Sequence, residues 1–540
     1  MTRVPATLPP APAGLAPVAP PTTLPALLDA AARRAPTRTA VLGRAAHPWS
    51  EWRRDTASLA SALQRSGIGR GDVVALHLPN SYGYLVLHAA LAALGAVTMP
   101  LHLAWGRREL ELLLDQADAV ALAVPDGPDS DGRAAYWREL CGPRRRLLLV
   151  DDEVLDSPDG PDGPGSGVDS GRGRAPRVSA LIADGTGRRP DPVTVSPEDP
   201  LALLTSSGTT SMRPKACLHT HGGLLGNAAA VAADCGALAS DVLISASPFT
   251  HAFGLLSVHL SLVTGGCQAL LPRWDAAGAA ALVARSGATV LFAVPAQLRD
   301  LLAYTTDPAV RLLLREVRTG GAPVPAELVR AVRRRFGARV CVQWGMSEVG
   351  AGCYTRPDDD LTAADPRSIG RPCTGGQARV RDGELWYRSA YQFRGYLGDP
   401  ELTAATVTPD GWIRTGDLAE PLPGGAIAYV GRTGDTVNRG GLKFSLVEVE
   451  TLLSDLPQLD RWAVVAMPDS RLGERAALLV TLRPGATLTL DDVRTHLAGK
   501  GLATYKWPEE VVVVDEIPVT PTGKVARGRL RSLLAGERRF

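Results

Sequence analysis

The sequence predicts an α/β protein with a large N-terminal region of layered sheets and helices and a small α+β C-terminal domain. Three observations lead to this prediction. The chain has 540 residues, which is too long for one ordinary domain. Apolar strands alternate with helical segments up to about Gly431, as in parallel sheets covered by helices. From about Asp435 onward, short strands and helices follow one another as in a compact α+β unit.

The expected elements follow in chain order. In the first part of the chain, helices are expected at residues 24–34, 52–66 and 84–94, and extended segments at 72–78 and 96–101. After Asp241, strands are expected at 243–247, 268–272 and 289–294, and helices at 255–262 and 276–285. In the C-terminal unit, helices are expected at 446–453 and 490–497, and strands at 462–467, 476–482 and 511–514.

Two segments contain too few apolar residues to pack. Residues 1–23 are rich in Pro and Ala and are expected to form a disordered arm. Residues 156–177 are rich in Gly, Pro, Asp and Ser and are expected to form a flexible surface insertion. The predicted large domain therefore spans residues 24–433, and the predicted small domain spans residues 434–540.

Composition excludes several classes of protein. The formal net charge is +2, which gives no electrostatic reason to expect nucleic acid or an anionic membrane as a partner. The seven cysteines are scattered without zinc-ligand spacing, which favours buried thiols in a reducing cytoplasm. The most apolar stretch, residues 85–103, is interrupted by His88, Gly95 and Pro100. It is therefore expected to be a buried helix followed by a strand, and not a membrane span.

A candidate phosphate-binding loop follows the apolar residues 201–204. It consists of small polar residues and ends at one of the rare lysines: Thr205, Ser206, Ser207, Gly208, Thr209, Thr210 and then Lys215. Hydroxyl and backbone N–H groups in a tight loop can bind phosphate oxygens, and a lysine adds a point charge. The spacing is not GxxxxGK[ST], which excludes the ordinary NTPase P-loop. A polar surface loop is the alternative interpretation.

The loop resembles the SSGTT…PK signature of the adenylate-forming superfamily, which includes acyl- and aryl-CoA synthetases, peptide-synthetase adenylation domains and luciferases. Further segments resemble the motifs of this family in the same order along the chain. They are PFTHAFG (248–254), GGAPV (320–324), QWGMSE (343–348), GELWYRSAYQFRGYLGDP (383–400), WIRTGDLA (412–419), GRTGDTVNRGGLKFSLVEVE (431–450) and PVTPTGKVARGRL (518–530). The resemblance spans residues 49–530 and implies the family fold, with a mobile C-terminal domain.

The resemblance implies that ATP is bound by several motifs together. Besides the phosphate loop, the implied nucleotide-binding residues are Gly321, Ala322, Trp344, Gly345, Ser347, Asp417 and Arg432. A tryptophan offers a flat π face for adenine, although it is more often a packing residue. One carboxylate, Asp417, can accept hydrogen bonds from both ribose hydroxyls, although an Asp after Gly is also common in turns. Arg432 is otherwise one surface arginine among many.

Two residues are implied to be catalytic. A carboxylate near triphosphate oxygens is repelled unless a cation lies between them, so Glu348 is expected to bind Mg²⁺. Lys524, in a turn near the C-terminus, is implied to neutralise charge at the α-phosphate during in-line attack. A surface Glu and a solvated Lys are the alternative interpretations.

The remaining implied site residues concern the acid, the thiol and the hinge. The acid-binding residues are Phe249, His251, Phe253, Gly320 and Met346, the thiol tunnel contains Gly440 and Gly441, and the hinge is Gly434. A histidine at the start of an apolar helix is more often a core residue, so His251 has two interpretations. Ser445 and Glu448 form an S-x-x-E pattern, which predicts a capping box for the helix at 446–453.

The chain departs from the family pattern at several positions. The phosphate loop is one residue longer before Pro214, and Ser211 and Ala216 replace customary glycines. Gly434, Leu446 and Ser389 also replace customary residues. These departures indicate a divergent branch.

The predicted function is ATP-dependent activation of a carboxylic acid to an acyl-adenylate, followed by transfer to the thiol of CoA. The amino-acid activators of the family carry an Asp in this motif to hold the α-ammonium group, and residues 249–252 contain no acid, so the resemblance implies that the substrate is not an α-amino acid. Phe249, His251, Phe253 and Ala322 favour an aryl or medium apolar acid. One alternative is a stand-alone adenylation enzyme that uses the phosphopantetheine of a carrier protein, an amine or another nucleophile. A further alternative is a non-catalytic nucleotide-binding homologue. The expected cofactors are ATP and Mg²⁺, the partners are a small carboxylic acid and possibly a carrier protein, and the location is cytoplasmic.

Overall fold

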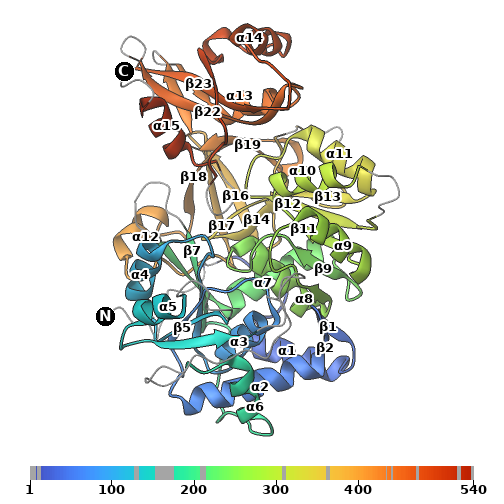
Figure 1. The fold of residues 1–540 in the computed structure, drawn as a ribbon, viewed down its shortest axis with the longest axis vertical. Coiled ribbons are helices and arrows are strands. Elements are labelled where there is room, and N and C mark those ends of the chain that lie inside the picture. The colour runs from blue at the N-terminus through green and yellow to red at the C-terminus, as the bar shows by residue number, and fades with distance from the viewer. Residues whose placement is uncertain are drawn as a thin grey trace.

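The computed structural model describes most of the chain. The described residues are 8, 12, 14–126, 133–151, 175–206, 215–306, 312–359, 365, 367–432, 435–439, 442–469, 473–519 and 525–536. Figure 1 shows a large N-terminal body with a small C-terminal domain above it. The predicted α/β class, with layered sheets and a smaller C-terminal domain, is confirmed.

The first sheet has the strand order β6-β5-β3-β4-β7-β8. Its strands are β3 (Val73–Leu76), β4 (Val97–Pro100), β5 (Ala121–Pro125), β6 (Arg146–Val150), β7 (Pro200–Ser206) and β8 (Lys215–Thr220). All neighbours pair in parallel except β7 and β8, which are antiparallel. The helices within this part of the chain are α2 (Trp49–Arg65), α3 (Tyr82–Ala93), α4 (Arg107–Gln116), α5 (Arg133–Cys141) and α6 (Val178–Gly185).

The second sheet has the order β15-β14-β13-β12-β11-β9-β10-β1-β2. Its strands are β1 (Thr39–Leu42), β2 (Ala46–Pro48), β9 (Val242–Ser245), β10 (Cys267–Ala269), β11 (Val290–Phe292), β12 (Glu316–Gly320), β13 (Arg339–Met346), β14 (Gly350–Tyr354) and β15 (Arg371–Pro372). The central pairs are parallel, and the pairs at both edges are antiparallel. Its helices are α1 (Leu24–Arg34), α7 (His221–Cys235), α8 (Ala252–Thr264), α9 (Ala276–Ser286), α10 (Pro295–Tyr304) and α11 (Ala326–Phe336).

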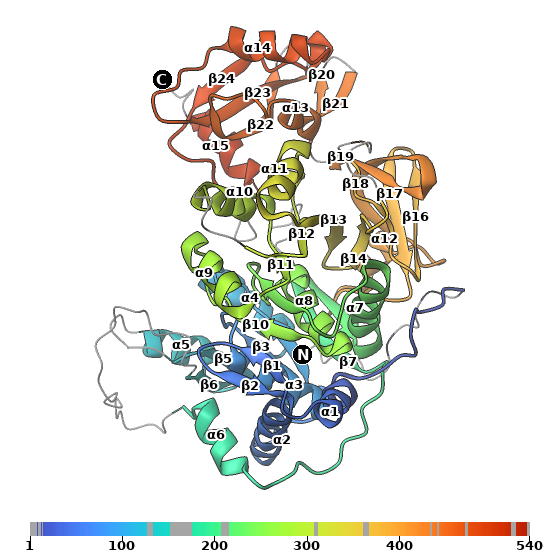
Figure 2. The same cartoon turned by 90° about the vertical axis from the view of Figure 1, so that its right-hand side faces the viewer.

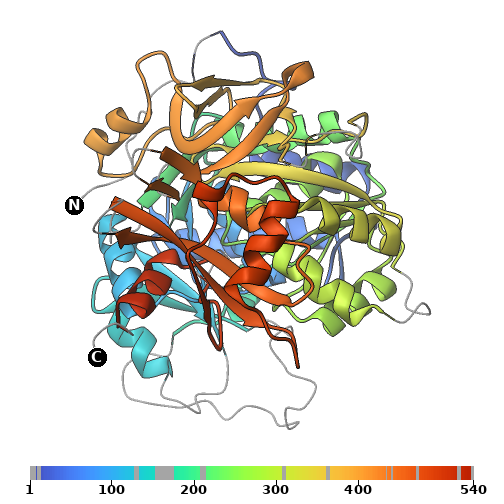
Figure 3. The ribbon, with the colours of Figure 1, turned by 90° about the horizontal axis from the view of Figure 1, so that it is seen from above.

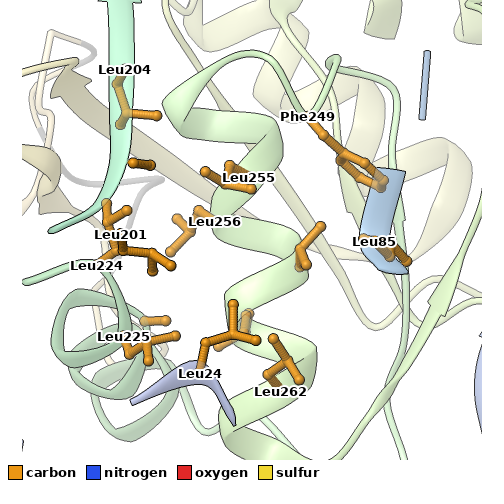
Figure 4. Close-up of a cluster of buried hydrophobic side chains, with 14 of the residues drawn as sticks. Leu24, Leu85, Leu201, Leu204, Leu224, Leu225, Phe249, Leu255, Leu256 and Leu262 are labelled. Carbon is orange, nitrogen blue, oxygen red and sulfur yellow. The ribbon is translucent and has the colours of Figure 1, made fainter. Parts of the chain in front are cut away.

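Helix α8 lies in the core between the two sheets. Its sequence is apolar on every side, as expected for a fully buried helix. Figure 4 shows Leu255 and Leu256 of α8 near Leu204 of β7, with Phe249 and Leu85 on the other side of the helix. The residues of this cluster are almost completely buried. Packing around α8 and α3 therefore holds the two sheets together and positions the loops at their ends.

A third sheet is antiparallel and was not expected as a separate unit. It has the order β16-β17-β18-β19 and consists of β16 (Gly376–Arg381), β17 (Glu384–Ser389), β18 (Ile413–Pro421) and β19 (Ile427–Arg432). Helix α12 (Pro400–Thr406) lies in the connection between β17 and β18. Figure 2 shows this sheet below the C-terminal domain and beside β13 and β14.

The C-terminal domain is built on a sheet of its own. Its elements are β20 (Thr436–Arg439), β21 (Leu442–Ser445), α13 (Leu446–Leu452), β22 (Leu459–Asp469), β23 (Gly473–Leu482), α14 (Leu490–Gly499), β24 (Glu510–Val513) and α15 (Arg527–Gly536). The chain passes from the third sheet to this sheet between Arg432 and Thr436. Figure 3 shows the domain from above, lying over the rest of the molecule. The guanidinium of Arg299 in α10 lies 5.6 Å from the ring of Trp462 in β22 and forms one contact between the two parts.

The predicted capping box at the start of α13 is wrong. The Ser445 hydroxyl does cap the helix, but it accepts from the backbone N–H of Val447 at 3.2 Å. The Glu448 carboxylate instead accepts two hydrogen bonds from Lys506 Nζ, at 2.7 and 2.8 Å. Glu448 therefore links α13 to the segment before β24, which is a structural role of a different kind.

Part of the segment expected to be a disordered arm contacts the body of the protein. The backbone N–H of Val18 donates to the Tyr391 hydroxyl at 2.9 Å, and Thr23 caps α1. Most of residues 1–13 and of the expected insertion at 156–177 lie outside the described residues. In the described part of the chain, no helix is both long and apolar enough to cross a membrane. The stretch 85–103 forms most of α3 and then β4, as expected.

Candidate functional site

The carboxyl ends of the strands in the two parallel sheets meet at Asn80. This residue follows β3 and is 3% exposed. Its amide nitrogen donates to the carbonyls of Ser245, the last residue of β9, and Ser247, at 3.2 Å each. Its Oδ1 accepts from the backbone N–H of Phe249 at 2.7 Å. Open α/β sheets bind ligands at the carboxyl ends of their strands, so this junction marks the candidate site.

Strands β7 and β8 hold the two ends of the predicted phosphate loop. Ser206 and Lys215 are partners in this antiparallel pair. The Thr205 hydroxyl is buried and donates to the carbonyl of Pro100 at 3.0 Å, which anchors the start of the loop to β4. Between them, the following predicted loop residues lie outside the described residues: Ser207, Gly208, Thr209 and Thr210. Their phosphate-binding role stays a prediction.

Glu348, Tyr396 and Lys215 form one group beside this loop. The Tyr396 hydroxyl donates to Glu348 Oε1 at 2.6 Å, and the Lys215 ammonium lies 5.2 Å from the centre of the Tyr396 ring. Glu348 is only 6% exposed. Burial, and after it the Glu348 carboxylate, raises the pKa of Tyr396 above its ordinary value. The phenol therefore stays protonated and remains a donor to the carboxylate.

The sequence did not predict Tyr396 as a site residue, although it belongs to the motif at 383–400. Its position after Gly395 in a family motif could have indicated a site residue. The neighbouring sequence does not show that its partner is Glu348, 48 residues earlier in the chain.

His219 supports the turn that carries Glu348. Its Nε2 donates to the carbonyl of Ser347 at 2.6 Å, which ties β8 to the end of β13. Burial lowers the pKa of His219 to about 4. The ring is therefore neutral near pH 7, and this hydrogen bond places its proton on Nε2.

Asp417 is held from both sides by neighbouring side chains. Trp344 Nε1 donates to Oδ2 at 2.8 Å, and Arg432 Nε donates to Oδ1 at 2.7 Å. Asp417 is 4% exposed and Trp344 is 6% exposed. Burial alone would lower the pKa of Arg432, but the Asp417 carboxylate outweighs it and raises that pKa. Each carboxylate oxygen keeps a lone pair beyond these bonds, so ribose hydroxyls could still donate to Asp417.

Trp344 also packs against the third sheet, because its ring lies 5.6 Å from that of Tyr387. The packing interpretation of this tryptophan is therefore present in the structure. Its indole N–H adds a second task, orientation of Asp417, which the sequence did not indicate. Contact with adenine stays a prediction.

Two glycines of the predicted site, Gly320 at the end of β12 and Gly345 in β13, leave no room for side chains. A Cβ at Gly320 would lie 2.0 Å from the Gln343 carbonyl oxygen, and a Cβ at Gly345 would lie 2.0 Å from the Gly350 carbonyl oxygen. Gly321 has a φ of 77°, which favours glycine. Ala322 is the next residue and is half-buried.

The predicted acid-binding residues do not all share one environment. Phe249 is 1% exposed and lies in the hydrophobic core (Figure 4), and its ring lies 5.5 Å from that of Tyr84. Its contacts therefore favour a core role. His251 precedes α8, and the centre of its ring lies 4.5 Å from that of His102.

Of the other three residues predicted to contact the acid, Gly320 is buried, and Phe253 and Met346 are half-buried. Phe253 lies 5.3 Å from the ring of Phe292, and Met346 ends β13 just before Ser347.

Several predicted positions lie outside the described residues. They are Gly434, Gly440, Gly441 and Lys524. Their roles as hinge, thiol tunnel and catalytic lysine stay predictions. Among the residues with a described placement, no group of three or more His, Cys, Asp or Glu side chains could hold a metal ion.

Family models, relatives and solved structures match this chain over most of its length. Residues 28–397 match the family model of AMP-binding enzymes, and residues 448–524 match that of the AMP-binding enzyme C-terminal domain. A salicylyl-CoA synthase / salicylate adenylyltransferase from Streptomyces sp is 33% identical over 542 residues, covering 92% of this chain and 94% of that protein. A 2-hydroxy-7-methoxy-5-methyl-1-naphthoate–CoA ligase from Streptomyces carzinostaticus is 31% identical over 533 residues, covering 94% and 92%. The structure of ATP-bound MatB from Rhodopseudomonas palustris has a TM-score of 0.80 and 26% identity, and the match covers 95% of this chain and 99% of that chain.

The fold and the matched segments define an enzyme of the AMP-forming acid–thiol ligase class. The chain belongs to the family of AMP-binding enzymes, in the adenylate-forming superfamily.

Proposed function

We propose that this protein activates an aromatic carboxylic acid with ATP and then transfers the acyl group to CoA. The observation that carries the proposal is a pair of side-chain groups joined by the end of β13. The first runs from Lys215 at the phosphate loop through Tyr396 to Glu348, which lies two residues after the end of β13, and the second runs from Trp344 in β13 to Asp417. Such an arrangement can hold a nucleotide with its phosphates at one end and its ribose at the other.

Each of these groups has a defined task in the proposed reaction. Lys215 and the loop bind the ATP phosphates, and Asp417, oriented by Trp344 and Arg432, accepts the ribose hydroxyls. The acid carboxylate attacks the α-phosphorus, the bond to pyrophosphate breaks, and an acyl-adenylate forms. The thiol then attacks the acyl carbon and AMP leaves. The resemblance assigns Lys524 to the first step and Gly434 to the rotation between the steps.

Mg²⁺ is the metal that this chemistry uses, and Glu348 fits it. Mg²⁺ in phosphate-transfer sites is bound by one or two carboxylates together with substrate phosphates, and not by a protein cage. A single buried carboxylate, held by Tyr396 and adjacent to the phosphate loop, meets that requirement. When bound, the ion would reduce the negative charge on the phosphates.

The proposed substrate is an aromatic acid that carries an oxygen substituent. Both relatives reported above are named for hydroxyl-bearing aromatic acids, and both match nearly the whole chain. The segment at 249–252 offers no carboxylate for an α-ammonium group. CoA is the proposed acceptor because both relatives are named for CoA products.

ATP–pyrophosphate exchange across a panel of acids tests this proposal. We expect exchange with hydroxybenzoates, a weaker signal with medium-chain fatty acids, and none with α-amino acids. Addition of CoA should then give the acyl thioester, whereas a product that forms only with a carrier protein would move the acceptor to that alternative. Exchange with no acid would contradict the proposal and favour a non-catalytic nucleotide-binding protein.

A variant at Lys524 can distinguish the adenylation step from the thioester-forming step. The variant Lys524→Ala is expected to lose pyrophosphate exchange by at least about a hundredfold, because a charge near the developing transition state is removed. It should still convert a supplied acyl-adenylate to the thioester. Equal retention of both half-reactions would refute the role assigned to Lys524.

A further inference from the structure

We propose that His102 binds the acid directly, through a hydrogen bond from its Nε2–H to an oxygen atom of the substrate. The inference rests on the proposed function, because it names a contact in the same site. His102 lies two residues after the end of β4, in a segment to which neither the motifs nor the proposed reaction assigns a role.

The hydrogen bonds of His102 identify its tautomer. The backbone N–H of Ala104 donates to Nδ1 at 3.1 Å, so Nδ1 acts as the acceptor. Burial lowers the pKa of His102 to about 4, so the ring is neutral near pH 7. A neutral imidazole with an accepting Nδ1 carries its proton on Nε2. Nε2 is therefore a donor and cannot take a proton from a nucleophile.

This donor has no acceptor among the described residues. The Nε2 atom is buried without a hydrogen-bond partner, and the whole residue is only 6% exposed. Buried donors are nearly always paired, because an unpaired one loses its hydration without compensation. An orphaned N–H at a ligand-binding junction therefore indicates that a ligand supplies the acceptor.

The position of His102 indicates which ligand this is. Its ring lies 4.5 Å from that of His251, in the motif that the family resemblance places against the acyl group. Two residues before His102 lies Pro100, whose carbonyl accepts from the Thr205 hydroxyl at the start of the phosphate loop. His102 thus lies between the phosphate loop and the acyl-side motif, where the carboxylate end of the acid must sit.

The acceptor is an oxygen, either on the aromatic ring or in the carboxylate itself. A thiol sulfur is only a weak acceptor and does not match a well-formed N–H donor. A hydroxyl beside the carboxylate and the carboxylate oxygens lie close together on such an acid. The two sources share one chemistry and are distinguished by comparing acids with and without the hydroxyl.

The test uses two variants that differ in this one hydrogen bond. The variant His102→Asn keeps an acceptor near the position of Nδ1 for the Ala104 N–H and removes the donor. The variant His102→Gln places an amide N–H near the position of Nε2. His88→Asn is the control, because His88 is also buried but both its nitrogens have partners, Thr98 and His259. Thermal unfolding and the KM for ATP show whether each variant is folded.

The readout is the KM for salicylate and for benzoate in ATP–pyrophosphate exchange with the full-length enzyme. We expect His102→Asn to raise the KM for salicylate about tenfold, as for loss of one buried hydrogen bond, and His102→Gln to recover most of it. If the KM of His102→Asn for benzoate is unchanged, the hydrogen bond goes to the ring oxygen. If the KM for benzoate rises as much as the KM for salicylate, the bond goes to the carboxylate. His88→Asn should leave both values unchanged.

Three results would overturn the proposal. They are a folded His102→Asn enzyme with unchanged KM for both acids, a rise confined to the KM for ATP, and a His102→Gln variant no better than His102→Asn. Failure of the proposed function has a different signature, because the wild-type enzyme would then exchange with neither acid.

Discussion

The hydrogen bond between Trp344 and Asp417 gives the sharpest test of the nucleotide site. The variant Trp344→Phe removes the indole N–H but keeps most of the aromatic packing against Tyr387. The lost bond is 2.8 Å long and its acceptor is a carboxylate that is only 4% exposed. Hydrogen bonds to charged groups contribute about 1.5–3 kcal/mol. At about 1.36 kcal/mol per factor of ten, kcat/KM for ATP should fall about 10- to 150-fold. The lower end is expected, because Arg432 still holds Oδ1.

The assay is pyrophosphate exchange at saturating acid with varied ATP and, in parallel, varied 2′-deoxy-ATP. If Asp417 binds the ribose, the wild-type enzyme discriminates against the deoxy nucleotide, and the variant discriminates less. Trp274→Phe is the matched control, because Trp274 also donates from Nε1 to a carboxylate, that of Asp300, at 3.0 Å, but lies outside the site. Values of kcat/KM for ATP within twofold of wild type, or equal losses in both variants, would refute the reasoning.

Three further predictions concern the site and its support. Tyr396→Phe removes the donor to a buried carboxylate and should slow exchange at least about tenfold, whereas Tyr354→Phe, which loses a similar bond to Asp234 outside the site, should not. Asn80→Ala removes three buried hydrogen bonds between the sheets and should destabilise by about 2–4 kcal/mol, seen as a lower thermal midpoint; an unchanged midpoint would contradict the bridging role. Burial lowers the pKa of His219 and of His221 to about 4, against about 6.5 in an unfolded chain, so the unfolded state binds more protons between these values. The free energy of unfolding by urea should therefore fall as the pH drops from about 6.5 toward 4, and a flat profile would be inconsistent with neutral buried histidines.

The periodic and apolar elements could be predicted from the sequence. Helix α1 was expected at 24–34 and is found at Leu24–Arg34, where a Thr cap and an early Pro mark its start. Helices α3 and α8 followed from long apolar runs, since a fully buried helix is apolar all round.

The third sheet was missed for a physical reason. Arginine side chains cover its tryptophans, and these charged residues hide the apolar face of the sheet in the sequence pattern. The guanidinium of Arg379 lies 4.1 Å from the centre of the Trp412 ring, and that of Arg388 lies 4.7 Å from it. Arginine stems and guanidinium planes can cover aromatic surface in this way. Hydropathy patterns therefore understate the burial of Trp386 in β17 and of Trp412 just before β18.

In the site, too, some residues could be predicted from the sequence and others could not. Glu348 and Asp417 could be selected from motif and residue type, but the partners that orient them could not. Tyr396 reaches Glu348, and Trp344 reaches Asp417, only after strands distant in the chain are brought together. The open donor of His102 is a property of its surroundings and leaves no mark in the sequence.

The most direct test of the central claim follows the oxygen atoms of the acid. Salicylate labelled with ¹⁸O in its carboxylate is incubated with the enzyme, ATP, Mg²⁺ and CoA. The ¹⁸O content of each product is then measured by mass spectrometry. Because the carboxylate attacks the α-phosphorus in the proposed reaction, AMP should carry one labelled oxygen, pyrophosphate should carry none, and salicylyl-CoA should form. Label in orthophosphate together with ADP, or no label transfer to AMP, would contradict an acyl-adenylate and with it the proposed function.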